Sequence, residues 1–261
     1  MKILVAGSPT NDADKLCVKH DVGKLYSYLN EQNEIREWNH GQMLMVDSGA
    51  HSWNKTSINK AGMASSKKPL PSAKVHYDEY IQFMKVHKDK PLVFVELDVY
   101  GKLDKDYLDA KYNETKQIGG MVQVMRVYHE MLDGGSLKVL KEWIDDGQTY
   151  IGLGSDAKQH YDKIFKLTKD KIKYHGFALT QINMVERYPF YSVDSTSPIA
   201  TVIFGLFFEK YLSCIGKDKM IKKRHWKLMM NDGERLEDAI KNVKSTELYL
   251  TDLWARRGVI W

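Results

Sequence analysis

Three aspartates, Asp47, Asp98 and Asp194, each follow a short apolar run and could carry acid–base or nucleophilic chemistry. A single aspartate in such a place is more often a helix cap or turn former, because its carboxylate readily accepts backbone N–H bonds. Three at equivalent places are harder to explain in this way, since carboxylates gathered in a low-dielectric site repel one another and lose hydration. We therefore expect a functional site with Asp47 and Asp194 as its central pair.

Other apolar runs also end in polar residues or glycines. Their ends are Ser48-Gly49-Ala50-His51, Tyr128-His129, Gly152-Leu153-Gly154-Ser155 and His175-Gly176. Each histidine taken alone is more readily explained as a hydrogen-bonded rim residue than as a metal ligand. Gly152 and Gly154 do not make a phosphate-loop fingerprint, although their missing side chains would let a flat ring approach the backbone.

The carboxylates suit two kinds of chemistry. They could bind a hard cation such as Mg2+, or act as acid, base and nucleophile at a sugar carbon. The two cysteines, Cys17 and Cys214, lie far apart, and the sequence has no CxxC motif or Cys/His cluster. This pattern predicts no structural zinc site and indicates the reducing cytoplasm. Composition leaves both chemistries open.

Short runs rich in Val, Ile, Leu and Tyr alternate with helical patterns, which is typical of βαβ units and a parallel sheet. We expect eight strands, at Ile3–Gly7, Met43–Ser48, Leu92–Val99, Met121–Tyr128, Tyr150–Gly154, Tyr174–Leu179, Pro189–Asp194 and Trp226–Met230. Parallel strands of a barrel deliver functional side chains at their C-terminal ends. A chain of 261 residues without an internal repeat or linker predicts a single (β/α)8 TIM-type barrel domain over residues 1–261.

Helical patterns fill most of the links between these strands. We expect helices at Asp14–Leu29, Tyr77–Val86, Lys105–Gln117, Ser136–Asp145, Ala157–Lys169 and Ile199–Leu212, and a last helix at Gly233–Arg257 packed on the barrel. Ser136 is a capping residue ahead of an amphipathic pattern. The link between the sixth and seventh strands shows no convincing helix. The long irregular stretch His51–Lys74 is expected to be a lid or binding loop.

Membrane insertion is not expected. The first apolar run stops at Gly7 and Pro9, too soon for a signal peptide, and the later run Ile199–Phe208 is well short of the ~20 residues that span a bilayer. The formal net charge of +5 modestly favours a polyanionic partner. Lysines cluster in residues 217–227 and at Lys67-Lys68, where a phosphate-facing strip could form.

In their order and strand placement, the strand-end motifs resemble those of the tRNA-guanine transglycosylase superfamily, and especially its smaller phage and bacterial relatives that put 7-deazaguanines into DNA. The resemblance runs from about Met43 to Phe204. It rests on VDSGAH at Val46–His51, ELDVYG at Glu96–Gly101, IGLGS at Ile151–Ser155, HGFALT at His175–Thr180 and YSVDSTSP at Tyr191–Pro198.

The resemblance implies a role for each matching residue. Asp194 would attack the anomeric carbon of a guanosine nucleotide and displace guanine, leaving a covalent glycosyl-enzyme. Asp47 would be the acid/base that deprotonates the incoming 7-deazaguanine, and Asp98 would accept hydrogen bonds from N1–H and the exocyclic amine of guanine. The substrate site would be lined by Ser48, Gly49, His51, Asp98, Tyr128, His129, Gly152, Leu153, Gly154 and His175.

Two departures from the family bear on the substrate. The tRNA enzymes carry a zinc subdomain with a CxCxxC…His pattern that this chain lacks, which favours DNA over tRNA and predicts no metal and no cofactor. Where the family offers a glutamine after the fourth strand, this chain reads Met125-Arg126-Val127-Tyr128-His129, so Tyr128 or His129 would recognise the carbonyl face of the base. Phosphate contacts would come from Lys222, Lys223, Arg224 and Lys227.

These observations predict a DNA guanine transglycosylase in the cytoplasm, of the host if the chain is phage-encoded. Its partners would be DNA with the nucleotide flipped out or single-stranded, a free 7-deazaguanine base, and a second copy of the chain or a helper protein. Three alternatives stay open: a related enzyme that acts on tRNA, a non-catalytic nucleic-acid-binding barrel subunit, and a Mg2+-dependent barrel hydrolase.

Overall fold

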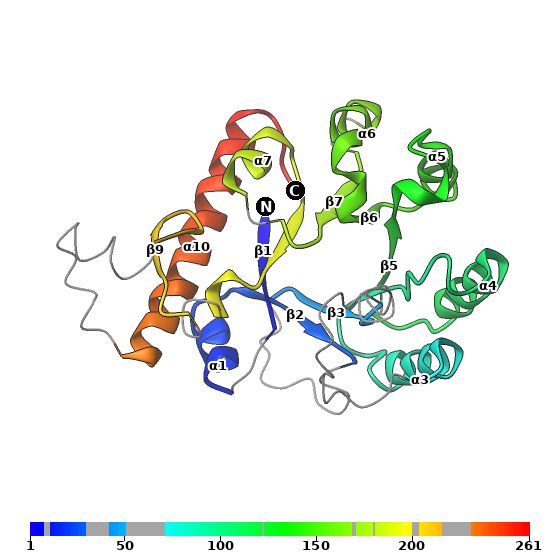
Figure 1. Cartoon of the computed structure of the whole chain (residues 1–261), viewed down its shortest axis with the longest axis horizontal. Coiled ribbons are helices and arrows are strands. Elements are labelled where there is room, and N and C mark those ends of the chain that lie inside the picture. The colour runs from blue at the N-terminus through cyan, green and yellow to red at the C-terminus, as the bar shows by residue number, and fades with distance from the viewer. Residues whose placement is uncertain are drawn as a thin grey trace, which may run out of the picture. The chain divides into compact units, whose positions relative to one another are not determined.

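The computed structural model describes residues 1–7, 11–29, 42–50, 71–121, 123–168, 171–179, 181–199, 204–215 and 231–261. Eight strands form a closed barrel in chain order, which confirms the predicted (β/α)8 fold (Figure 1). Their bounds are β1 Lys2–Ala6, β2 Gly23–Ser27, β3 Leu44–Asp47, β4 Val93–Val95, β5 Gln123–Tyr128, β6 Tyr150–Leu153, β7 Lys173–Gly176 and β8 Ser192–Ser195. Strand β1 pairs in parallel with β2 and β8, β4 with β3 and β5, and β7 with β6 and β8.

Helices follow most of the strands. Their bounds are α1 Asn11–Lys19, α3 Ala73–Val86, α4 Lys105–Lys116, α5 Lys138–Asp145, α6 Tyr161–Thr168, α7 Ile182–Arg187 and α10 Asp232–Arg256, with short 3-10 helices at Glu130–Leu132 (η1) and Ser155–His160 (η2). Helix α10 begins with a capping box in which Asn231 and Glu234 bind each other's backbone N–H. No helix in the described part of the chain is both long and apolar enough to cross a membrane.

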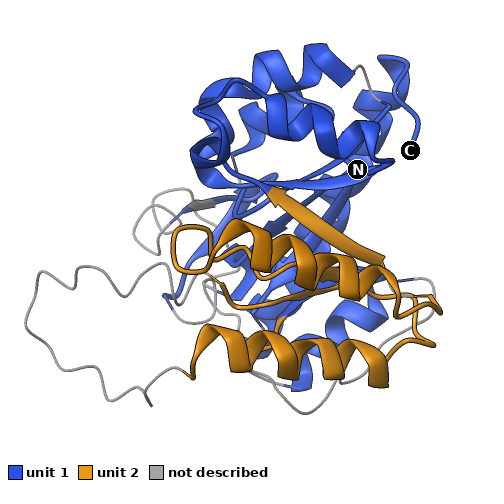
Figure 2. Cartoon of the chain, turned by 90° about the vertical axis from the view of Figure 1, so that its right-hand side faces the viewer, with its two compact units in different colours: residues 1–26, 35–44, 128–261 blue, residues 27–34, 45–127 orange. Residues whose placement is uncertain are grey.

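The chain divides into two compact units, coloured separately in Figure 2. Residues 1–26, 35–44 and 128–261 form unit 1, and residues 27–34 and 45–127 form unit 2. The core of unit 1 joins apolar side chains of β1, α1, α5, α6 and α10, as in Ile3, Cys17, Trp143, Ile164 and Ile240. In unit 2 a group of rings packs together, made by Tyr28, His76, Tyr80, Phe83 and Phe94.

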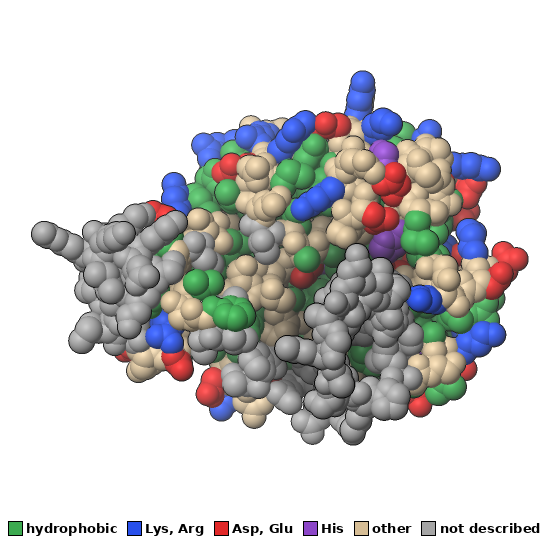
Figure 3. All heavy atoms as spheres, in the orientation of Figure 1, with side chains coloured by type: hydrophobic (Ala, Val, Ile, Leu, Met, Phe, Trp, Pro, Cys, Tyr) green, Lys and Arg blue, Asp and Glu red, His purple; other side chains and the backbone are tan. Residues whose placement is uncertain are grey.

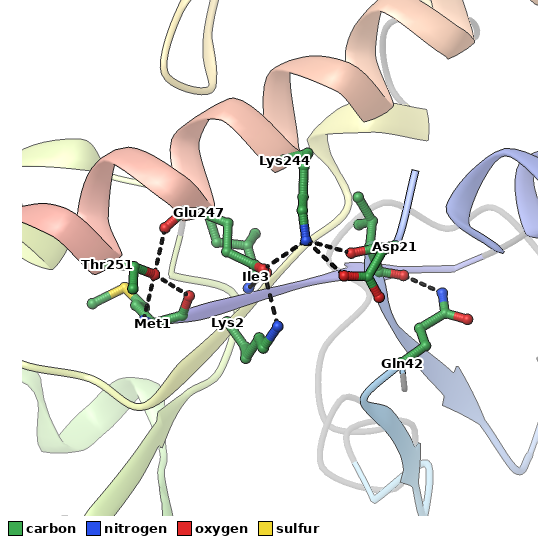
Figure 4. Close-up of polar contacts among 9 residues, drawn as sticks. Met1, Lys2, Ile3, Asp21, Gln42, Lys244, Glu247 and Thr251 are labelled. Atoms are coloured by element: carbon green, nitrogen blue, oxygen red, sulfur yellow. Dashed lines mark hydrogen bonds and ion pairs between the residues drawn. The ribbon is translucent and has the colours of Figure 1, made fainter. Parts of the chain in front are cut away.

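Within unit 1, helix α10 is tied to strand β1 by a buried carboxylate (Figure 4). Glu247 accepts hydrogen bonds from the backbone N–H of Ile3 and the ammonium group of Lys2, each at 3.1 Å. Lys244 lies 3.3 Å from the same carboxylate and 2.9 Å from Asp21. Both carboxylate oxygens of Glu247 are therefore met by donors, as a buried carboxylate requires.

The predicted helix Asp14–Leu29 is wrong beyond Lys19. Asp21 adopts a left-handed conformation with φ of 51°. The chain then enters strand β2, where Gly23 is needed because a Cβ there would lie 3.1 Å from the carbonyl oxygen of Met43. The spacing of apolar residues along this segment resembles a helical period. A lysine is also not expected in a buried strand, and Lys24 is tolerated in β2 because Asp14 forms an ion pair with it.

The predicted helix Ile199–Leu212 is also wrong over residues 204–212, although Ile199 itself is helical. Residues 204–215 contain an antiparallel hairpin of β9 Phe207–Lys210 and β10 Ser213–Ile215. Tyr211 and Leu212 form its turn with φ of 41° and 61°, a conformation that a helix interior does not allow. An apolar run without breakers resembles a helix in sequence, and here the turn is made by residues that rarely signal one.

Two smaller differences separate the predicted elements from the observed ones, and two predicted segments lie outside the described residues. The link predicted to lack a helix contains α7, which at 6 residues is too short to show periodicity. The helix predicted from Ser136 begins at Lys138, and its first turn is capped by Asp133, whose carboxylate accepts the N–H groups of Gly135 and Val139 at 3.0 and 2.9 Å. The expected eighth strand, Trp226–Met230, and most of the expected loop, residues 51–70, lie outside the described residues.

Candidate active site

Asp194 lies in strand β8 of unit 1 with only 6% of its surface exposed. Its Oδ1 accepts a hydrogen bond from the backbone N–H of Ala178 at 2.7 Å. Nε2 of His175 lies 3.3 Å from the same oxygen, within ion-pair distance but not aligned as a hydrogen bond. Two nitrogen atoms, the backbone N of Ala178 and Nε2 of His175, thus lie close to Oδ1 of Asp194.

The other ring nitrogen of His175 is hydrogen-bonded to Ser192, which is hydrogen-bonded in turn to Tyr150. Nδ1 of His175 lies 2.7 Å from Oγ of Ser192, and that Oγ lies 2.5 Å from the hydroxyl of Tyr150. All three residues are buried. A continuous polar chain therefore runs from Tyr150 through Ser192 and His175 to Asp194.

Strand register accounts for this arrangement. His175 of β7 pairs directly with Ser192 of β8, and Asp194 lies two residues further on the same face of its strand. Ala178 adopts φ of 49°, and this left-handed turn aims its N–H at Asp194. Non-glycine residues rarely hold that conformation, which costs on the order of 1 kcal/mol or more and persists where the surroundings require it.

A second pair of side chains follows strands β5 and β6 in unit 1. Nδ1 of His129 lies 3.0 Å from Oδ1 of Asp156. Burial raises the pKa of Asp156, but the hydrogen bond and the charge of His129 lower it by more. The net pKa therefore lies below its usual value. Gly154 passes so close that an added Cβ would lie 2.5 Å from Nδ1 of His129. The glycine is therefore required by the position of the imidazole.

Tyr128 faces away from this pair. Its hydroxyl donates to Asp133 at 2.8 Å, and its ring packs edge-on against Trp143 of α5. Burial, followed by the bond to Asp133, raises its pKa, so the hydroxyl stays protonated at neutral pH. Of the two residues expected to recognise the carbonyl face of a base, Tyr128 thus has its hydroxyl engaged by Asp133, and His129 has Nδ1 engaged by Asp156.

In unit 2, Asp47 ends strand β3 in a tight turn. Its Oδ2 accepts the N–H of Gly49 at 3.1 Å, and Gly49 has φ of +86° with an added Cβ only 2.6 Å from Leu29. Ser48 donates from Oγ to the carbonyl of Glu96 at 3.0 Å, and the ring of His76 lies 2.8 Å from the carbonyl of Ser48. These contacts give the half-buried Asp47 carboxylate a fixed turn.

Asp98, also half-buried in unit 2, lies two residues beyond a buried glutamate that was not expected to matter. Glu96 accepts hydrogen bonds from Val127 N at 2.8 Å, the Tyr100 hydroxyl at 2.9 Å and Nε of Arg126 at 3.2 Å. Burial raises the pKa of Glu96 more than Arg126 and the backbone N–H lower it. The sequence did carry a signal for this ion pair between Glu96 and Arg126, because each is a charged residue inside an otherwise apolar run.

The structure thus brings some of the expected residues together within each unit. Strand pairing in unit 1 places Gly152 beside His175 and Leu153 beside Gly176. Tyr150 and Ser192 are additional polar members that sequence reasoning missed, because they lie at the N-terminal ends of their strands, whereas the expected site residues were sought at the C-terminal ends. Five expected residues lie outside the described part of the chain, namely His51, Lys222, Lys223, Arg224 and Lys227.

Across the described residues, no three His, Cys, Asp or Glu side chains are grouped so that they could hold a metal ion. No protein-family model and no curated protein matches this chain. The chemistry of the site is therefore inferred from its residues and their geometry.

Proposed function

We propose that the protein is a base-exchange transglycosylase that replaces guanine in DNA with a 7-deazaguanine through a covalent aspartyl-glycosyl intermediate. The observation that carries the proposal is the buried carboxylate of Asp194. Its Oδ1 is held by Ala178 N–H, whereas among the described residues no group binds Oδ2. A carboxylate nucleophile needs this combination of a fixed orientation and one oxygen left to reach the carbon.

The proposed reaction is a double displacement. Oδ2 of Asp194 attacks C1′ of a deoxyguanosine, the C1′–N9 bond breaks with its electron pair moving to N9, and protonated Asp47 supplies the proton that neutralises the leaving guanine. Asp47, now a carboxylate, takes the N9 proton of the incoming 7-deazaguanine. That nitrogen attacks C1′ and expels Asp194 as a carboxylate, so two inversions give net retention.

Base recognition is proposed for small, apolar and acidic residues at the strand ends. A carboxylate at Asp98 would accept from N1–H and the exocyclic amine of guanine, a pair of donors that adenine does not offer. The small residues Ser48, Gly49 and Gly152 leave room for a flat ring, and Leu153 gives it an apolar neighbour. His129, held by Asp156, is proposed to contact the carbonyl face.

DNA must present its nucleotide flipped out or single-stranded, because the anomeric carbon is shielded in a duplex. Lys222, Lys223, Arg224 and Lys227 are proposed to bind phosphates. On the face drawn in Figure 3, the described lysine and arginine side chains are scattered among acidic ones rather than gathered in one strip. We place the reaction in the reducing cytoplasm, of a bacterial host if the chain is phage-encoded, where a free thiol such as buried Cys17 persists.

The deciding experiment is a guanine-exchange assay with the purified protein. Duplex DNA, single-stranded DNA and tRNA, each carrying radiolabelled guanine, are incubated with 7-cyano-7-deazaguanine, with and without a chelator. We expect label to leave DNA and the deazaguanine to enter it, independently of the chelator. Exchange with tRNA alone would transfer the proposal to RNA, and loss of activity with the chelator would favour the Mg2+-dependent hydrolase.

A further inference from the structure

We propose that Tyr150 and Ser192 are positioning residues that fix the proton of a neutral His175 on Nε2, so that this N–H points at Oδ1 of Asp194 and Oδ2 is left as the reacting oxygen. The proton arrangement is a property of the folded protein alone. Its consequence for catalysis rests on the proposed function.

The direction of the hydrogen bonds follows from counting donors. Within the described part of the chain, the Tyr150 hydroxyl has Ser192 Oγ as its one partner, and Ser192 Oγ has Tyr150 and His175. Burial raises the pKa of Tyr150, so its hydroxyl keeps its proton and needs an acceptor. Tyr150 therefore donates to Ser192, and Ser192 donates to Nδ1 of His175.

The two alternatives each leave a buried proton without an acceptor. If Nδ1 of His175 donated to Ser192 and Ser192 to Tyr150, the tyrosine proton would have no partner among the described residues. If Ser192 accepted from both neighbours, its own proton would be left. An unmet buried donor costs about 1–3 kcal/mol, so the arrangement that uses both hydroxyl protons is preferred.

At the other end of the ring, the charge of Asp194 favours the same tautomer. A proton on Nε2 faces Oδ1, whereas a bare Nε2 would turn its lone pair toward a carboxylate oxygen 3.3 Å away. The contact is long and not aligned as a hydrogen bond, and catalytic hydrogen bonds often tighten only when substrate binds. Both ends of the polar chain thus select the Nε2–H form.

This arrangement has a chemical consequence in the proposed reaction. Once Oδ2 is bonded to C1′, Oδ1 becomes the ester carbonyl, and negative charge returns to the carboxylate as the second displacement expels it. The N–H groups of Ala178 and His175 then stabilise the developing charge. Removing one donor of this kind from a site of developing charge lowers kcat by about 100-fold or more.

The tautomer is tested directly by 15N NMR of protein labelled at histidine, with the His175 signals assigned by their loss in His175→Gln. We expect a protonated Nε2 and an unprotonated, hydrogen-bonded Nδ1 at neutral pH. A proton on Nδ1, or on both nitrogens, would overturn the proposal. The tautomer itself is read on the unmodified protein, and the variant serves only to assign the signals.

Ser192→Ala should shift the Nδ1 signal, because it removes the hydroxyl that donates to it. Tyr174→Phe is the matched control, since Tyr174 adjoins His175 in β7 but packs on Phe165 of α6, on the opposite face of the strand. It should leave both ring signals in place. Equal shifts in the two variants would mean that Ser192 acts only through general packing.

Two substitutions of His175 test the catalytic consequence. The amide nitrogen of Gln lies as many bonds from Cα as Nε2, and that of Asn as many as Nδ1. His175→Gln can therefore keep a donor toward Asp194, whereas His175→Asn keeps only the Ser192 side. We expect kcat for exchange to fall by about 100-fold in the Asn variant and by less than about 10-fold in the Gln variant, with the KM for DNA unchanged in both.

The outcomes separate this inference from the proposed function. If the protein exchanges no guanine but His175 carries its proton on Nε2, the proposed function fails and the positioning role stands. If exchange occurs and the proton is on Nδ1, the positioning role fails alone. Equal loss of kcat in the Asn and Gln variants would reject the donor role toward Asp194.

Discussion

The guanidinium group of Arg126 lies 3.2 Å from the carboxylate of Glu96, and both side chains are more than nine-tenths buried. Arg126 also binds Asp109 at 2.6 Å, so the pair braces β4 against β5 and α4. Glu96 precedes Asp98 by two residues. The brace therefore supports the segment that is proposed to recognise the base.

Arg126→Met should be strongly destabilising, because it leaves the Glu96 carboxylate buried without its cation. We expect unfolding in urea to require about 3–5 kcal/mol less free energy than in the unmodified protein. The double variant Glu96→Gln with Arg126→Met removes both charges and should recover part of that loss. Equal destabilisation in the single and double variants would show that the arginine acts by packing rather than by charge.

Asp133 should make stability depend on pH in the acid range. Burial raises its pKa, but bonds from Tyr128, Val139 N and Gly135 N lower it more, so the folded value lies below 3.8. The unfolded protein therefore binds a proton first, and the stability contributed by Asp133 is present above about pH 3.8 and is lost as the pH falls through the folded pKa.

Asp133→Asn should cost about 1 kcal/mol at pH 7, the usual value of a lost helix cap. Urea unfolding curves recorded from pH 7 down to pH 3 should show the gap between variant and parent closing at the acid end. A gap that stays constant over this range would contradict the assignment of the cap to the ionised carboxylate.

Asp194→Asn should preserve folding and DNA binding but abolish the protein–DNA adduct, because an amide cannot attack C1′. Denaturing gels of reactions stopped in detergent measure the adduct. Asp252→Asn is the matched control, since it makes the same change at an exposed position of α10 and should leave adduct formation intact. Undiminished adduct in Asp194→Asn would refute the choice of nucleophile.

Asp47→Asn should behave differently from Asp194→Asn. It removes the group that activates the incoming base, so some guanine can still be released while the exchange is not completed. Separate measurements of guanine release and deazaguanine incorporation should therefore diverge in this variant. Loss of both in equal measure would indicate that the first displacement needs the Asp47 proton as strongly as the second needs the Asp47 carboxylate.

Gly154→Ala should displace the ring of His129, because the added methyl would lie 2.5 Å from Nδ1. We expect destabilisation of about 1–3 kcal/mol, the usual cost of overpacking, and a higher KM for the incoming base. In the double variant Gly154→Ala with His129→Ala the clash with the ring is gone, and the Asp156 carboxylate, whose Oδ1 would lie 2.6 Å from the added methyl, no longer has His129 to hold it in place and can turn away. The second substitution should then restore stability while the KM stays high.

Most of the barrel could be predicted from the sequence, because parallel strands covered on both faces are nearly continuous apolar runs. The strand ends that carry Asp47 and Asp194 follow from the same pattern. Strand β2 could not be found in this way, since Lys24 reads as a solvated residue until Asp14 is known to meet its charge. The order and direction of the strands were predictable, and the ion pairs that tolerate charge inside them were not.

The contacts around the candidate nucleophile Asp194 could not be predicted from the sequence either. His175 and Ser192 meet because β7 and β8 align in one register, and a shift of one residue would turn each to the opposite face. No local pattern specifies that register. The hairpin of β9 and β10 also could not be predicted. Its sequence has the composition of a helix, but Tyr211 and Leu212 adopt the left-handed conformation and turn the chain back on itself.

The tie between Glu247 and Ile3 joins residues 244 positions apart, which bears on how the protein is made. During synthesis the N-terminal strand leaves the ribosome long before the helix that completes its hydrogen bonding. Strand β8 is made earlier and can already pair with β1, but the N–H of Ile3 lacks its acceptor until Glu247 is in place. Synthesis of α10, rather than collapse of the first half of the chain, is therefore the step that completes the hydrogen bonding of β1.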